Sequence, residues 1–153
     1  MSSLISSMGR GGVSSGDLGA YVTALINQPW DRGGLHCWRL VRDVQRDLFG
    51  RDLPPVFDTA PDRRATKAEA FADHPERARW RDIAAPAHGA VALMSRKGAR
   101  PDFVEHAGVW LDLDGGGLLH VDAPHGVVFD SLVELASVRR WASPQFFLPT
   151  PVK

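Results

Sequence analysis

Residues 37–50 read CWRLVRDVQRDLFG, which indicates an amphipathic helix that begins at the chain's single cysteine. Its apolar residues recur at spacings of three and four, the period of a helix with one buried face. They are Leu40, Val41, Val44 and Leu48. Gly50 is typical of a helix end. A thiol in the first turn lies near backbone amides whose partial positive charge favours the thiolate. Cys37 is therefore a candidate nucleophile.

Two further helices and several strands are expected around this segment. Apolar residues from Leu18 to Leu25 predict a helix that ends before Pro29, and the capping pair Ser131 and Glu134 predicts a last helix through Val138. The charged residues 62–83 are interpreted as one or two surface helices. Short apolar segments bounded by Gly, Pro and Asp predict strands. These segments are residues 89–94, 107–113, 118–122 and 126–129.

The order of these elements predicts the fold class. Helices come first and a meander of strands follows, with glycines at 115–117 suited to a hairpin loop, so the sheet is expected to be antiparallel and the fold α+β. The Ser- and Gly-rich residues 1–16 are interpreted as a flexible tail. Residues 17–153 then form one domain, a normal size for a single core.

Composition disfavours several classes of function. Eighteen basic residues balance eighteen acidic ones, so no strong field favours nucleic acid or an anionic membrane. No apolar run is long enough to cross a bilayer, and the N-terminus lacks a signal core, so synthesis in the cytoplasm without a signal peptide is expected. A single cysteine excludes an internal disulfide and a site of several thiolates. We expect neither a metal nor a cofactor.

A lone cysteine is usually a small buried hydrophobe, and catalysis requires a base and a group that orients the base. His106, just before an apolar strand, and His120, in the strand after the glycine loop, are the candidates. A five-residue hairpin loop from Leu113 to Gly117 places His120 on the face of His106, whereas a four-residue loop places it on the opposite face. His125 is the alternative third residue.

Two separated segments resemble the NlpC-type cell-wall peptidases, in the variant found in tailed bacteriophages. The first is GGLHCWRLVR at 33–42 with FGRDLP at 49–54, and the second is HAGVWL at 106–111 followed by LLH at 118–120. The resemblance implies a papain-like fold in which N-terminal helices pack on a small antiparallel sheet. It implies Cys37 as nucleophile, His106 as base and His120 as the orienting residue, in amide hydrolysis through a thioester.

The resemblance also implies a substrate, the stem peptides of peptidoglycan, and a location in a virion tail acting at the cell wall beside other tail proteins. This chain has His36 where the family usually has Asp, and Trp30 where the family often has a tyrosine. Together with Trp38, these residues are expected to contact the substrate. Residues 61–85 match nothing in the family.

Two alternatives remain open at this point. The domain could be a structural component of a tail tip with a weak or silent site, as the departures at His36 and Trp30 suggest. It could also be a related thiol amidase or acyltransferase that acts on another amide or ester. The reactivity of Cys37 and its dependence on His106 separate the first alternative from an enzyme.

Overall fold

The computed structural model describes residues 15–29, 36–55, 75–100, 104–122 and 125–151. In these ranges the chain forms three α-helices, one 3-10 helix and one six-stranded sheet in which all neighbouring strands are antiparallel. The expected α+β class is confirmed. Within the same ranges, no helix combines the length and apolar character needed to cross a membrane.

The helices follow the expected pattern closely. They are α2 (Ser15–Leu25), α3 (Cys37–Phe49) and α5 (Leu132–Ser137), with the 3-10 helix η1 at Pro75–Arg79. Helix α3 ends at Gly50, whose φ of 64° suits a residue without a side chain, and α5 carries the expected capping box of Ser131 and Glu134. Helix α2 begins at Ser15, two residues before the start of the expected domain at Asp17, and residues 1–14 lie outside the described ranges.

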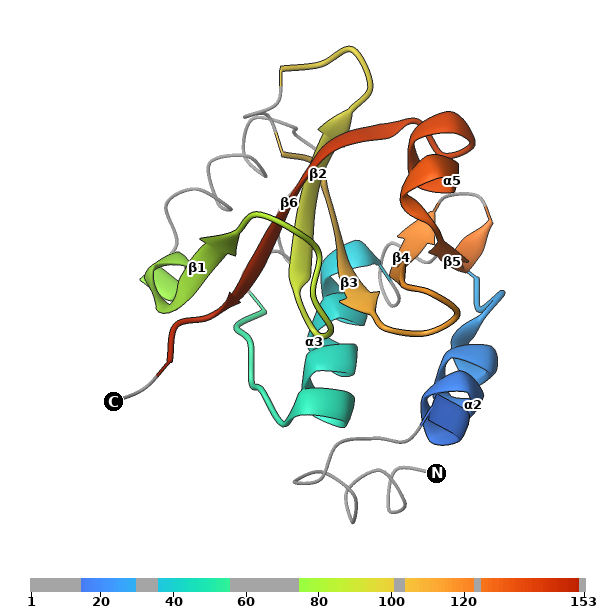
Figure 1. The fold of residues 1–153 in the computed structure, drawn as a ribbon, viewed down its shortest axis with the longest axis horizontal. Helices are drawn as coiled ribbons and strands as arrows, with labels where there is room; N and C mark the ends of the chain where they lie inside the picture. Colours follow the sequence, from blue (N-terminus) through green and yellow to red (C-terminus); the bar gives the residue numbers. More distant parts are fainter. Residues whose placement is uncertain (1–14, 30–35, 56–74, 101–103, 123–124, 152–153) are drawn as a thin grey trace.

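The sheet contains the four expected strands and two others. Its strands are β1 (Trp80–Ile83), β2 (Val91–Arg96), β3 (His106–Leu111), β4 (Gly117–Asp122), β5 (Gly126–Asp130) and β6 (Trp141–Pro149). Their order across the sheet is β1-β6-β2-β3-β4-β5. Figure 1 shows the long, red β6 between β1 and β2, so the last strand of the described chain lies inside the sheet and joins β1 to β2.

The two additional strands correct the sequence interpretation. Residues 80–83 form β1 and not a surface helix, because four backbone pairs with β6 fix them in extended conformation. Strand β6 escaped prediction because Ser143-Pro144 interrupts its apolar pattern. Ser143 has a φ of 52°, and the pairing of β6 with β2 shifts register nearby, between Leu93 and Ser95. Proline is tolerated inside a sheet at such an irregularity.

Two apolar layers lie on opposite faces of the sheet. The first face packs against α2 and α3 through alternate residues such as Val109 and Val121. The second face carries Trp110, Leu118 and Trp141 and is covered by α5 through Leu135. Strand side chains alternate between faces, so the even-numbered positions of β3 and β4 belong to the second face. The second face holds the polar site described below.

Helix α3 runs along β3 in the same direction (Figure 1). Near its C-terminal end, Gln45 Nε2 donates to the carbonyl oxygen of Gly89, at 2.9 Å, and the Gly89 amide donates to the carbonyl of Trp110. The thirteen residues of α3 span about 18 Å, comparable to β3. Cys37 therefore lies toward the end of the sheet at which His106 begins β3.

Candidate active site

His106 and His120 meet in the interior of the protein. The His106 Nε2 atom lies 2.9 Å from the His120 Nδ1 atom, and the two rings meet edge to face at 79°. Both residues are buried, His120 completely. The hairpin between β3 and β4 has a five-residue loop at residues 112–116, one position earlier than the expected 113–117, since Leu111 pairs with Gly117. Of the two loop lengths considered, the structure has the one that places both imidazoles on one face.

Gly108 explains how the two rings reach one another. It lies on the second face two residues after His106, and the strand register puts it directly across from His120. A Cβ atom at Gly108 would stand 2.9 Å from the carbonyl oxygen of Leu119 and 3.1 Å from the His120 Cβ atom. Only glycine leaves this space open. The diagonal contact across two strands therefore depends on the missing side chain.

Asp130 extends the pair of imidazoles. The His120 Nε2 atom lies 2.7 Å from the Asp130 Oδ2 atom, and the Asp130 carboxylate also accepts hydrogen bonds from Arg139, from Nε at 3.0 Å and from Nη2 at 3.4 Å. Burial raises the pKa of Asp130, but the hydrogen bonds from His120 and Arg139 outweigh it and hold the pKa below its ordinary value. The carboxylate is therefore ionised at neutral pH.

Neither Asp130 nor Arg139 was among the residues expected from the sequence. Asp130 ends the apolar strand GVVFD, and its cross-strand partner is Leu118, which places it diagonal to His120. The sequence does contain a signal for Asp130, since an acidic residue directly follows the apolar run of this strand. Arg139 gives no such signal, because its position depends on how α5 folds back onto the sheet.

Trp141 forms one wall of the site. Its ring is stacked on His106, with centroids 4.3 Å apart and planes 10° apart, and its indole Nε1 donates to Asp122 Oδ1 at 3.4 Å. Asp122 Oδ2 in turn lies 3.9 Å from Arg139 Nη1. From the neighbouring strand β2, the Arg96 guanidinium lies over the Trp141 ring, 4.3 Å from its centroid. The His106 ring is thus fixed on its flat face as well as at its edge.

Cys37 is the first residue of α3 and is partly exposed. His36 caps the helix, with its Nδ1 atom accepting a hydrogen bond from the Arg39 amide at 3.3 Å. His36 is thus the N-cap residue of α3, a role for which Asp is also well suited. The first backbone amides of a helix have no acceptor within the helix, so the Cys37 amide suits an oxyanion.

The other residues expected at the site differ in position. Trp38 is buried in the first-face core, and its indole nitrogen donates to the Pro54 carbonyl at 2.8 Å, which are the contacts of a packing residue. Trp30 lies outside the described residues. His125 is exposed immediately before β5, while His120 occupies the position next to His106.

The helix and the rings lie on different faces of the sheet. α3 packs on the first face, whereas the His106 ring lies on the second face against Trp141. Cys37 and His106 each begin their element, and both lie toward the same end of the sheet. A contact between a thiol on α3 and the His106 ring would have to pass around the start of β3 and not through the sheet.

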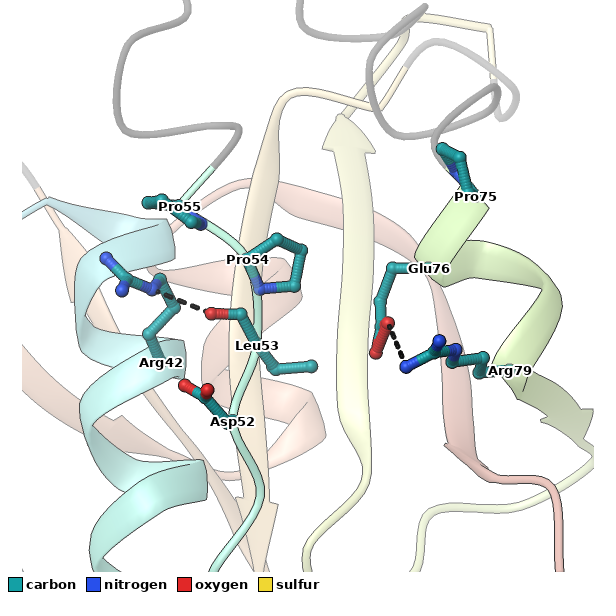
Figure 2. Close-up of a pocket in the computed structure, with 8 residues that line it drawn as sticks. All are labelled: Arg42, Asp52, Leu53, Pro54, Pro55, Pro75, Glu76 and Arg79. Atoms are coloured by element: carbon teal, nitrogen blue, oxygen red, sulfur yellow. Dashed lines mark hydrogen bonds and ion pairs between the residues drawn. The ribbon is translucent and has the colours of Figure 1, made fainter.

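A cavity of about 480 Å³ lies elsewhere, between α3, the segment that follows it and η1 (Figure 2). Three of its charged side chains are engaged: Arg42 donates to the Leu53 carbonyl at 3.1 Å, and Glu76 pairs with Arg79 at 3.8 Å. Figure 2 shows neither imidazole among its lining residues. Within the described ranges, no group of three or more His, Cys, Asp or Glu side chains is placed to hold a metal ion.

Comparison with known proteins gives no relative from which a role could be transferred. No protein-family model, no curated protein and no solved structure matches the chain significantly.

Proposed function

We propose that this protein is a thiol hydrolase in which Cys37 is the nucleophile and His106 its base. The observation that carries the proposal is the buried series His106, His120 and Asp130, joined by contacts of 2.9 and 2.7 Å, at the end of the sheet toward which Cys37 lies. A nucleophile, a base and an ordered set of groups behind the base are what acyl transfer requires.

The chemistry follows from the order of the groups. His106 takes the thiol proton, and the Cys37 sulfur attacks the substrate carbonyl. The oxyanion that forms is stabilised by backbone N–H groups at the start of α3. Its collapse breaks the C–N bond, His106 protonates the leaving amine, and a thioester remains. Water then hydrolyses the thioester with His106 as base, which releases the acid and restores the thiol.

The substrate class and the family rest on the motif resemblance. We propose a papain-like domain of the NlpC type that cuts amide bonds in peptidoglycan stem peptides, delivered in a virion tail. The HAGVWL motif supports the proposal, because His106 and Gly108 have distinct parts in building the imidazole pair. The first motif segment supports it as well, because helix α3 begins at Cys37.

Thiol alkylation tests the catalytic part. Because Cys37 is the single cysteine, the rate of iodoacetamide incorporation reports on it alone. We expect the rate to persist at about pH 6 to 7, below the ordinary thiol pKa of ~8.5, and to fall about tenfold in His106→Ala. His125→Ala is the matched control, an exposed histidine whose loss should leave the rate unchanged.

The outcomes separate the alternatives. A rate that follows an ordinary thiol titration and ignores His106→Ala contradicts the hydrolase and favours a structural tail component. If the thiol is activated, incubation with purified muropeptides and mass spectrometry tests the substrate. Intact stems together with turnover of small esters would assign a thiol amidase or acyltransferase in place of a peptidase.

A further inference from the structure

The proton positions in the imidazole series follow from Asp130. Its carboxylate is held by two nitrogens of Arg139 and is ionised, so it can only accept hydrogen bonds. The contact of 2.7 Å with His120 Nε2 therefore requires a proton on Nε2. A neutral His120 then has its lone pair on Nδ1, the atom that faces His106.

The same reasoning applies one step further along the series. Since His120 Nδ1 is an acceptor, the 2.9 Å contact requires that His106 carry its proton on Nε2. The basic lone pair of a neutral His106 is then on Nδ1. Reversing the proton on either ring would place two hydrogens, or two lone pairs, in one contact, so the two tautomers change together.

We propose that Asp130 and Arg139 are positioning residues that fix both tautomers, so that Nδ1 of His106 is the nitrogen that accepts a proton. The catalytic consequence, proton transfer from Cys37 to that nitrogen, rests on the proposed function. The tautomers themselves do not. Arg139 acts through Asp130 and His120, which stand between it and His106, and neither positioning residue takes up the proton.

Arg139 also supports the flat face of His106. Its guanidinium lies 3.9 Å from Asp122 Oδ2, and Asp122 accepts from the indole of Trp141, which stacks on His106. The partly buried guanidinium of Arg139 therefore contacts two carboxylates. Asp130 lies behind His120, which contacts the edge of the His106 ring, and Asp122 lies behind Trp141, which stacks on its flat face. Arg96, over the Trp141 ring, is a second cation that faces this cluster.

The planar fork of arginine suits this place better than a lysine. The contacts of Nε and Nη2 with the two oxygens of Asp130 define the plane of the carboxylate, whereas an ammonium would contribute charge without that geometry. Arg139→Lys is therefore a conservative variant that keeps the charge, and Arg139→Gln removes the charge. Arg81→Gln is the matched control, since Arg81 is an exposed arginine on β1.

Nuclear magnetic resonance of the full chain with ¹⁵N-labelled histidine tests the proposal, because ring nitrogens with and without a proton have distinct shifts. Signals are assigned with His106→Gln and His120→Gln. At a pH where both rings are neutral, we expect a proton on Nε2 of both rings in the wild type and in Arg81→Gln. In Asp130→Asn the amide can donate to His120 Nε2, so both rings should shift toward the Nδ1-protonated form.

The variants at Arg139 give graded results. Arg139→Lys should retain most of the Nε2-protonated population, and Arg139→Gln should lose more of it, in samples whose amide spectra show a folded chain. At neutral pH, Asp130→Asn should lower the alkylation rate of Cys37 about tenfold, as a base in the wrong tautomer cannot take the thiol proton. Arg139→Lys should fall between the wild type and Asp130→Asn.

Each failure has its own signature. A proton on His106 Nδ1 in the wild type, or tautomers that are unchanged in a folded Asp130→Asn, overturns this proposal even if Cys37 is activated. If the tautomers behave as expected and Cys37 reacts as an ordinary thiol, the assignment of Asp130 and Arg139 stands, and the hydrolase proposal fails.

Discussion

His106 Nε2 lies 2.9 Å from His120 Nδ1, although each side chain comes from a different strand and the residue directly across from His120 is Gly108, not His106. The contact is diagonal across the β3/β4 pair. It joins the residue that begins β3 to one near the middle of β4, and from there the series continues to Asp130 on β5. Three neighbouring strands thus contribute one polar group each to the same buried line.

Two isosteric substitutions of His120 separate its two contacts. An asparagine side chain ends near the place of Nδ1 and can still accept from His106, whereas a glutamine ends near the place of Nε2 and can still reach Asp130. We expect His120→Asn to keep the Cys37 alkylation rate within about threefold, and His120→Gln to lower it about tenfold. Equal rates in the two folded variants would show that the contact with His106 is not the important one.

Gly108→Ala is expected to destabilise the fold by about 1–3 kcal/mol, because its Cβ would collide with the backbone of Leu119 and with His120. Gly19→Ala in α2 is the matched control. A Cβ there makes one ordinary contact at 3.9 Å, with Leu113, so the change should stabilise the helix by about 0.5–1 kcal/mol. Chemical denaturation measures both, and a Gly108→Ala protein as stable as the wild type would contradict the packing argument.

Asp130 should make the stability of the fold depend on acid pH. Its pKa is lower folded than unfolded, so its contribution is present above about pH 4 and is lost as pH falls through the folded-state pKa. At neutral pH, Asp130→Asn should cost ~2 kcal/mol, and the difference from wild type should shrink below pH 4 in thermal unfolding. Asp82→Asn is the control, since that side chain is 74% exposed. A difference that does not vary with pH would argue against an ionised Asp130.

Tyr21 is the chain's single tyrosine, so ultraviolet absorbance reports its ionisation directly. Burial raises its pKa, and the hydrogen bond that it donates to Asp47 at 2.8 Å raises the pKa further. We expect no tyrosinate at about pH 10, where an exposed tyrosine is half ionised, until the protein unfolds.

The sign of this effect follows from the raised pKa. Stability from neutral Tyr21 is complete below the ordinary value and is lost as pH rises toward the folded-state value. Asp47→Asn should allow ionisation at lower pH than in the wild type, while burial keeps the pKa above the ordinary value. Normal titration of Tyr21 in the folded wild type would contradict the link between α2 and α3.

Local patterns in the sequence were sufficient for the fold class and for the helix and strands that carry Cys37, His106 and His120. The spacing of apolar residues and Gly50 predict the helix from Cys37 to Phe49, and the capping pair Ser131 and Glu134 predicts α5. The order of helices and strands gave the α+β class. These features depend on neighbours within a few positions along the chain, which is the range over which periodicity and capping act.

The tertiary structure alone decided how the polar groups combine. It placed His120 beside His106, chose the loop length that allows this, and added Asp130 and Arg139 behind them. It also inserted β6 into the sheet despite Ser143-Pro144. Strand order and diagonal contacts depend on which segments distant in sequence pair with one another, and that choice is made by burial of both faces of the whole sheet, which no local pattern records.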